Sequence, residues 1–333
     1  MGPGASRACT GEGEIESERL DAGHRPATRT NARTWIAAGV LVALIVAFGA
    51  YYYYDRYVTP AGVVEAPDPI EQLESAVQGS PGDVDLRVSL AENYLLNRRY
   101  DDAIAQAEQV LEAYPDKDRA LLVAGVAYSL SDRAEDAVTP LTRFISIRRK
   151  AQGAALDTSL EAALYYQADS FLKLGRPADA VKPLREAVEI SPTDADALHL
   201  LGTAFAAIGE HAKAISAFER AIALVPQFGE SYQAMAESYD ASGKTILGDY
   251  ARAMVAFAAK DYVAARDGLL AVLARKKAFA PAHLGLGLTY EQLGDLEKAR
   301  AHLKTAVKQE PASIAVQQAL GRVEATIQQQ DGS

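Results

Sequence analysis

Two patterns of hydrophobic and polar positions divide the chain. Residues 35–54 form a run of 20 residues without a charged side chain, beginning at Trp35 and ending in four consecutive tyrosines. From residue 68 onward, apolar residues recur at helical spacing in short stretches that polar turns separate. The first pattern predicts one hydrophobic helix, and the second predicts a long array of amphipathic helices.

The uncharged run has the length and the flanks of a membrane span. At about 1.5 Å per residue, a helix of this length covers roughly 30 Å, the thickness of a bilayer core. Trp35 at one end and Tyr51 to Tyr54 at the other match the two aromatic belts of a membrane helix. A buried helix of a soluble domain fits poorly, because neither face carries a polar residue. We therefore predict a transmembrane helix at 35–54, in contact with membrane lipid.

Basic residues predict the orientation of this helix. Arginines before the span outnumber those just after it, where Arg56 stands alone. The four arginines that precede the span most closely are Arg19, Arg25, Arg29 and Arg33. The positive-inside rule places the N-terminus in the cytoplasm and everything after residue 54 outside it. The chain is thus predicted to be a single-pass protein of a cell membrane.

The segments on either side of the span are predicted to lack a core. Residues 1–34 are polar and have no apolar clusters, which predicts a disordered cytoplasmic tail. Residues 55–67 contain prolines, a glycine and acidic residues, which predicts a short extended linker. A cleaved signal peptide ending near 47–49 is the alternative; the long, partly acidic leader and the length of the apolar run favour an anchor.

The helical array has a period of 34 residues. Prolines that end apolar stretches recur at Pro81 and Pro115, and again at Pro192 and Pro226. Each proline is taken as position 32 of a unit. Units then begin at Val84, Asp118, Glu161, Ala195, Gly229, Ile246 and Ala280, with half-units at 68–81 and 313–329 as caps.

When the units are aligned, certain positions hold the same kind of residue in each. These positions predict two antiparallel helices, A and B, that pack together in each unit. Position 8 is always small, position 11 is mostly aromatic and position 20 is mostly alanine. Small residues let the helices approach closely, and the aromatic ring fills the groove beside them. Position 8 holds Ala91, Gly125, Ala168, Gly202, Ala236, Ala253, Gly287 and Gly321.

This column pattern resembles the tetratricopeptide repeat (TPR) over roughly residues 68–325. The resemblance implies an all-α fold, a TPR-type solenoid of antiparallel helix pairs over 68–329, here preceded by the transmembrane helix. It also implies that the A helices line a concave groove that holds extended or helical peptides of partner proteins.

Two stretches depart from the period. Residues 148–158 contain an insertion, which predicts a lengthened helix or a loop. Residues 229–245 supply a helix A pattern, with Tyr232 and Tyr239, but no matching helix B before the next unit begins. We therefore expect an irregular stack around 243–259, either a kink or a partner-docking surface.

The resemblance also implies which side chains face the groove, since family positions 5, 9 and 12 of helix A usually do. These residues are Val88, Glu92, Leu95, Leu122, Val126, Tyr165, Asp169, Leu172, His199, Thr203, Gln233, Glu237, Asp240, Leu284, Leu288 and Glu291. They mix carboxylates with apolar side chains, which suits neutral-to-basic, partly apolar peptides. TPR domains that clamp chaperone C-termini need a Lys and an Asn where this chain has Val88 and Glu92, so that ligand class is disfavoured.

Composition and motifs argue against other functions. The net charge of -10 disfavours nucleic acid as a partner. Cys9 is the single cysteine, and the five histidines lack the spacing of metal ligands. Gly243-Lys244-Thr245 ends like a P-loop, but Ser238 stands where that motif needs glycine. We predict no enzymatic activity, no cofactor, no metal and no small-molecule substrate.

These observations together predict a membrane-tethered scaffold that binds partner proteins or peptides through its concave surface, in the assembly of an envelope complex. The high content of alanine and arginine indicates a bacterial source. The alternative function is a chaperone-like holder of exported polypeptides at the membrane surface. A scaffold would co-purify with one defined complex, whereas a holder would capture many unfolded chains.

Overall fold

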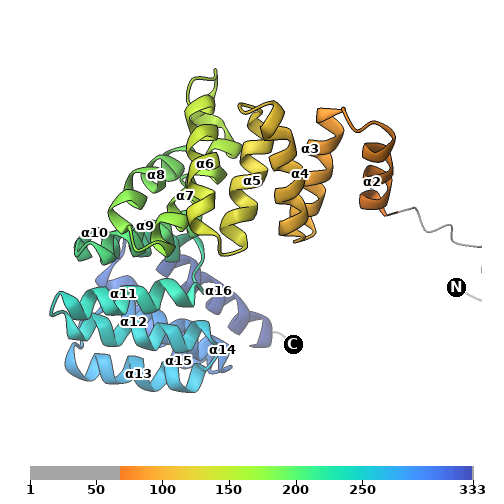
Figure 1. Cartoon of the computed structure of the whole chain (residues 1–333). Coiled ribbons are helices and arrows are strands. Elements are labelled where there is room, and N and C mark those ends of the chain that lie inside the picture. The colour runs from red at the N-terminus through yellow and green to blue at the C-terminus, as the bar shows by residue number, and fades with distance from the viewer. Residues whose placement is uncertain (1–67, 332–333) are drawn as a thin grey trace, which may run out of the picture. The chain divides into compact units, whose positions relative to one another are not determined.

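The computed structural model describes residues 68–331, which form fifteen α-helices, one short 3-10 helix and no strand (Figure 1). The prediction of an all-helical solenoid is confirmed for this range. The predicted tail (1–34), transmembrane helix (35–54) and linker (55–67) lie outside the described residues. Within 68–331, no helix is both long and apolar enough to cross a bilayer.

The helices form consecutive A and B pairs. The A helices are α3 (Val84–Leu96), α5 (Asp118–Leu130), α7 (Thr158–Lys173), α9 (Ala195–Ala207), α11 (Gly229–Ala241) and α14 (Ala280–Gln292). The B helices are α4 (Tyr100–Ala113), α6 (Ala134–Arg148), α8 (Pro177–Ile190), α10 (His211–Leu224), α13 (Tyr262–Arg275) and α15 (Leu296–Gln309). Helix α12 (Thr245–Ala258) is treated below, and α2 (Pro69–Gly79) and α16 (Ile314–Asp331) close the two ends.

The two kinds of helix occupy different sides of the solenoid. Each helix packs on the next one along the chain. Successive A helices, such as α5 and α7 or α7 and α9, also contact each other, whereas successive B helices make no comparable contact. The A helices therefore form the inner side of the stack, and the B helices spread apart on the outer side.

Every turn from an A helix to a B helix has the same backbone geometry. Position 15 is left-handed in each, whether or not it is glycine: Arg98, Asp132, Gly175, Gly209, Gly243, Lys260 and Gly294. The next backbone N–H donates to the carbonyl five residues earlier, as from Arg176 to Phe171 at 2.8 Å. This bond closes a Schellman motif, which stops helix A and reverses the chain.

Position 8 of helix A lies directly against position 24 of helix B. A Cβ added at Gly202 would come within 2.5 Å of the Phe218 ring, and one added at Gly125 within 2.5 Å of Leu141. Both opposing side chains are completely buried. The glycines are therefore required by the distance between the helices, since a methyl group has no space there.

The insertion forms a connection between α6 and α7 that projects beyond the ends of neighbouring helices (Figure 1). It contains a left-handed Gly153 and a 3-10 helix, η2 (Ala154–Leu156), with no buried residue. Asp157 caps α7 and pairs with Arg148 at 2.7 Å. The insertion is thus fastened at its base, while Leu156 is 84% exposed.

Helix α12 belongs to two repeats at once. In the unit that begins at Gly229 it occupies the helix B positions, and in the unit that begins at Ile246 it occupies the helix A positions. It packs on α11 and α13, and it also contacts α14, the next A helix. The turns on both sides, at Gly243 and Lys260, are of the A-to-B type. The expectation that 229–245 lacks a helix B is therefore wrong, because two repeats share one helix; the regular alternation nevertheless breaks here.

Replacing Gly202 by alanine tests the close approach of the two helices. The added methyl group would meet the buried Phe218 ring. We expect Gly202→Ala to lower the free energy of unfolding by about 1–2 kcal/mol, because overpacking outweighs the gain in helix propensity. Urea denaturation followed by circular dichroism measures this change.

Gly321→Ala is the matched control. Gly321 occupies the same column in α16, but nothing lies within 4 Å of its added Cβ. We expect this substitution to stabilise the protein by about 0.5–1 kcal/mol through helix propensity alone. Equal effects of the two substitutions would contradict the proposed contact.

Candidate peptide-binding groove

The structure places the residues expected in the groove in different surroundings. Val88 and Val126 are 0% and 7% exposed and belong to the hydrophobic core, so a peptide cannot reach them. Other apolar members are half-buried and pack on the core clusters: Leu95, Leu122, Tyr165, Leu172, Leu284 and Leu288.

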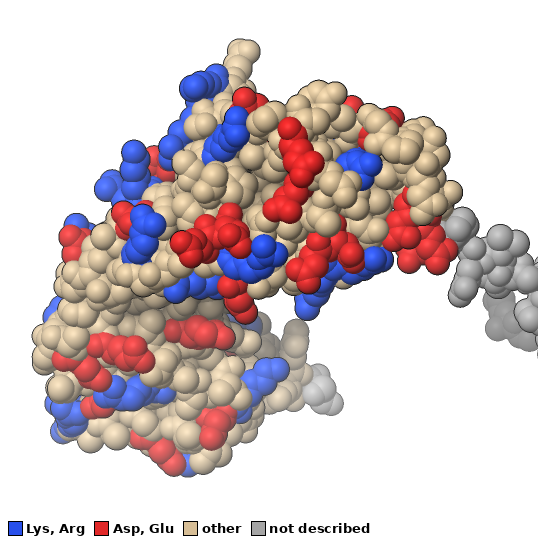
Figure 2. Space-filling view, viewed as in Figure 1, with Lys and Arg blue, Asp and Glu red and all other residues tan. Residues whose placement is uncertain are grey.

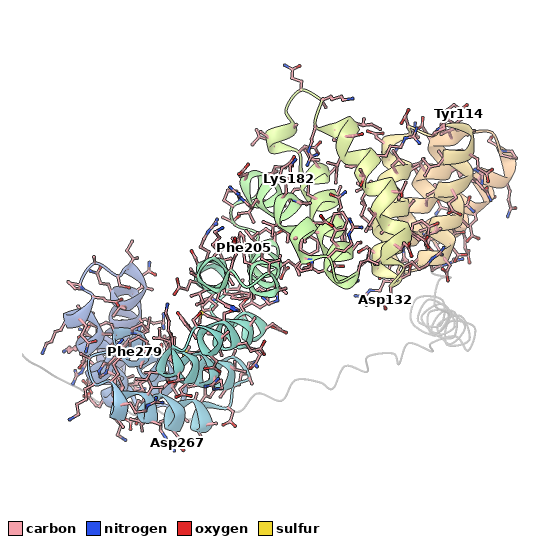
Figure 3. The ribbon with its side chains drawn as sticks, turned by 60° about the vertical axis from the view of Figure 1, so that its left-hand side comes forward. Tyr114, Asp132, Lys182, Phe205, Asp267 and Phe279 are labelled. Atoms are coloured by element: carbon pink, nitrogen blue, oxygen red, sulfur yellow. The ribbon has the colours of Figure 1, made fainter. Side chains whose placement is uncertain are left out.

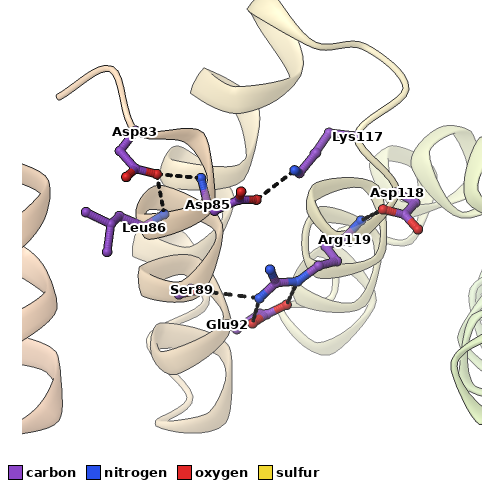
Figure 4. Close-up of polar contacts among 8 residues, drawn as sticks. All are labelled: Asp83, Asp85, Leu86, Ser89, Glu92, Lys117, Asp118 and Arg119. Carbon is purple, nitrogen blue, oxygen red and sulfur yellow. Dashed lines mark hydrogen bonds and ion pairs between the residues drawn. The ribbon is translucent and has the colours of Figure 1, made fainter. Parts of the chain in front are cut away.

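Several of the carboxylates expected in the groove form ion pairs with lysine or arginine side chains of the protein itself. Arg119 of α5 binds both carboxylate oxygens of Glu92 on α3, with N···O distances of 2.8 and 2.6 Å (Figure 4). Comparable ion pairs hold Asp169 with Lys173, Asp240 with Arg252 and Glu291 with Arg322. These pairs bridge neighbouring turns or helices, so the acidic character expected for the whole groove is neutralised over much of its length.

The remaining four expected residues come together in one place. His199 and Thr203 of α9 and Gln233 and Glu237 of α11 line a single open cavity of about 640 Å³. Helix α12 completes the lining. We call this cavity the α9–α11 groove, formed by His199, Thr203, Gln227, Gly229, Glu230, Gln233, Ala234, Glu237, Val255, Ala258 and Ala259.

His199 is held in a fixed, uncharged state in this groove. Its ring lies 5.0 Å from the Phe228 ring and 5.6 Å from the Phe218 ring, centre to centre. Nδ1 is 2.9 Å from the hydroxyl of Ser231. Burial lowers the pKa of His199 below its usual value, which favours the neutral imidazole at neutral pH. His199 therefore offers a ligand an aromatic surface without a charge.

The charged side chains that line the α9–α11 groove are all acidic. Glu230 and Glu237 are exposed, and neither forms an ion pair with the described residues. Gln233 donates a hydrogen bond to Glu237 at 2.9 Å, which orients that carboxylate. The groove thus has a negative potential along α11 and an apolar wall on α12.

Comparison with protein families identifies this architecture. Two family models described as tetratricopeptide repeats match residues 148–195 and 165–227, and residues 65–124 and 256–323, which together cover more than half of the chain. The chain belongs to the TPR family. Proteins of this family generally mediate protein–protein interactions. A comparison with curated proteins gives no match.

Several solved structures align with this TPR chain. The crystal structure of MamA protein is 22% identical, covers 54% of this chain and 93% of its own, and has a TM-score of 0.47. The structure entitled YrrB, a TPR protein with an unusual peptide-binding site, is 17% identical with coverages of 75% and 98% and a TM-score of 0.42. The APC/C hetero-tetramer Cut9-Hcn1 is 16% identical with coverages of 77% and 46% and a TM-score of 0.41.

The contribution of α12 to the TPR groove did not emerge from the sequence. In the frame that begins at Ile246, Val255, Ala258 and Ala259 fall at the end of a helix A, outside positions 5, 9 and 12. In the frame that begins at Gly229, the same helix has the small residue expected at position 20, namely Gly248. That column was the signal that could have revealed a shared helix and its place beside α11.

A carboxyl pair lies where α7 meets the start of α9. Asp194 caps α9 by accepting hydrogen bonds from the N–H groups of Asp196 and Ala197. Glu161 of α7 lies beside this carboxylate, and its Oε1 is buried without a donor. Burial and the hydrogen bond to Asp194 raise the pKa of Glu161 to about 7. Protonated Glu161 can donate to Asp194, whereas the ionised form repels it.

The stability of the TPR domain should therefore depend on pH near neutrality. The ordinary pKa of Glu161 is 4.5, but the folded protein retains the proton up to about pH 7. The folded state binds more protons within this interval, so the free energy of unfolding falls as the pH rises from about 4.5 to above 7. Glu161→Gln keeps a donor at all pH values, and it should stabilise the protein at pH 8 but not at pH 4.5.

Urea denaturation at the two pH values measures this difference. Glu112→Gln removes one charge from an exposed position on α4 and serves as the control. A stabilisation by Glu161→Gln that is the same at both pH values would contradict the assigned titration.

Proposed function

We propose that this protein is a scaffold that binds a neutral-to-basic, partly apolar segment of a partner protein in the α9–α11 groove. The observation that carries this proposal is the convergence of α9, α11 and α12 on one open cavity of about 640 Å³ that has free carboxylates and no cation in its lining. Carboxylates attract lysine or arginine side chains, and the apolar wall accommodates aliphatic side chains between them.

The spacing of the carboxylates defines the ligand further. Glu230 and Glu237 are seven residues apart on α11 and thus lie on one face, about 10 Å apart along the helix axis. A peptide in the polyproline II conformation rises about 3.1 Å per residue with three residues per turn. Two basic side chains three residues apart therefore lie on one side, about 9 Å apart, and would meet the two carboxylates, with an apolar residue between them directed at α12.

Charge reversal of both carboxylates tests this mode of binding. The probe is a fluorescein-labelled peptide with two lysines three residues apart and valines between them, and fluorescence anisotropy measures its affinity for the full-length chain. We expect Glu230→Lys with Glu237→Lys to weaken binding at least about tenfold, because attraction becomes repulsion. Glu112→Lys with Glu135→Lys changes the net charge equally at exposed positions outside the groove and should have little effect. Equal losses in both double variants would contradict site-specific binding.

A photo-crosslinking residue at the exposed position Gln233, used in the native cell, addresses the identity of the partner. Crosslinks to one defined set of envelope proteins would support the scaffold. Crosslinks to many unrelated exported chains would indicate a chaperone-like holder instead.

We also propose that residues 35–54 tether the protein to a bacterial membrane, with the solenoid outside the cytoplasm and the protein acting in the assembly of an envelope complex. The uncharged run and the excess of arginines before it support this topology. A tether would confine the protein to the membrane and raise the local concentration of membrane-bound partners.

Reporter fusions test the topology. Alkaline phosphatase, which is active only outside the cytoplasm, is fused after Ser333 and is expected to be active. A fusion after Thr34 removes the span and should be inactive. Activity of a cytoplasmic reporter alone at Ser333 would refute the proposed orientation.

A further inference from the structure

The B helices carry a second concave region, which the proposed function does not use. Two adjoining cavities of about 620 and 600 Å³ flank α8 and share residues from it. One lies between α8 and the α6–α7 connection, and the other lies between α8 and α10. We call this surface the α8 groove, and its principal residues are Val181, Lys182, Arg185, Phe205, Ile208 and Arg220.

The α8 groove exists because the B helices spread apart on the outer side of the stack. Between α8 and α10 the helix beneath, α9, becomes accessible and contributes Phe205 and Ile208. Ile208 is 38% exposed, and Val181 of α8 is half-buried beside it. The lining thus forms an apolar strip between two parallel helices, a shape that suits the apolar face of another helix.

Charge distinguishes the α8 groove from the α9–α11 groove. Its lining contains five cationic and three acidic side chains. Two of the acids are already paired, Glu186 with Arg149 and Glu210 with Lys213. Lys182, Arg185 and Arg220 remain without a hydrogen bond or ion pair to any residue in the described part of the chain, against one unpaired acid, Glu189. This excess of positive charge stands out in a chain of net charge -10.

The insertion forms one edge of this groove. Ala154 and Ala155 of η2 line the cavity beside α8, and the neighbouring Leu156 is 84% exposed. Figure 2 shows lysine and arginine side chains along the surface from this connection to α8, and Figure 3 labels Lys182 and Phe205 within it. Ala154 of η2 packs at the edge of the core without being fully buried, whereas Leu156 stays exposed. Its position supplies the groove with a raised, partly apolar edge.

We propose that the α8 groove is a second docking site, whose ligand is an amphipathic helical segment of a partner protein with an apolar stripe and acidic flanks. The stripe packs on Val181, Phe205 and Ile208. The acidic side chains pair with Lys182, Arg185 and Arg220. Lys182 and Arg185 are three residues apart on α8 and therefore project on the same side. The two grooves have opposite charge, so one chain can hold two chemically different partners.

Designed helical peptides test this site on the full-length chain. One probe has leucines at helical spacing with glutamate flanks, and a second has the same leucines with lysine flanks. Because the acidic α9–α11 groove is expected to bind the lysine probe, the two probes are compared on the chain that carries Glu230→Lys with Glu237→Lys. Fluorescence anisotropy at low salt should show that this chain binds the glutamate probe only. Lys182→Glu with Arg185→Glu should weaken this binding at least about tenfold, and Ile208→Ser should weaken it severalfold. All three positions are exposed, so the variants are expected to fold, and circular dichroism verifies this.

Lys277→Glu with Lys308→Glu is the matched control, because it reverses two exposed cations outside the groove. Its affinity for the glutamate probe should remain within about twofold of that of the unaltered chain, since the change in net charge alone acts weakly. Glu230→Lys with Glu237→Lys should likewise leave this affinity unchanged, so failure of one groove is distinguishable from failure of the other.

Three results would overturn the proposal. Equal binding of the two probes to the chain that carries Glu230→Lys with Glu237→Lys would remove the charge preference, and insensitivity to Lys182→Glu with Arg185→Glu would place the probe elsewhere. Self-association of the chain that depends on Lys182 and Arg185, without binding of the glutamate probe, would identify a second copy as the occupant.

Discussion

The close approach of helix A to helix B in each repeat is the constraint on which the rest of the structure depends. Glycine or alanine at position 8 faces a buried side chain at position 24, as Gly202 faces Phe218, and no larger residue fits between them. This contact makes each pair a rigid unit with one apolar side left over. The next pair covers that side, so the units stack, the A helices meet on the inner side, and the B helices separate on the outer side. Both grooves are consequences of this unequal spacing.

The two proposed binding surfaces lie where the regular stack is interrupted. The α9–α11 groove receives its apolar wall from α12, the helix that two repeats share. The α8 groove receives one edge from the insertion between α6 and α7. Regular repeats, by contrast, use their inner carboxylates internally, as Glu92 and Arg119 do. Interruptions of the 34-residue repeat thus leave surface exposed that a partner could contact. The regular repeats hold these surfaces in place.

The sequence predicted the helices well because the small and aromatic residues at fixed positions of the repeat make their contacts within one repeat. It predicted the groove less well, since the family positions describe an average repeat and each side chain has a particular neighbour. Val88 is core because the adjacent helices cover it, and Glu92 is neutralised because the following repeat happens to carry Arg119. The double role of α12 is hidden in the sequence because Gly248 and Ala253, on different faces of one helix, satisfy the small-residue positions of two overlapping repeats.

The shared helix also reverses the polarity of the inner surface. Each helix runs antiparallel to its predecessor, so α3 to α11 contribute A helices that all point in one direction. Because α12 ends one pair and begins the next, the later A helices α14 and α16 point the opposite way. The amino ends of the inner helices, and with them the positive ends of the helix dipoles, therefore change from one rim of the solenoid to the other. A peptide bound across both segments would have to satisfy opposite directional preferences, because the inner surface has opposite helix polarity in its two parts.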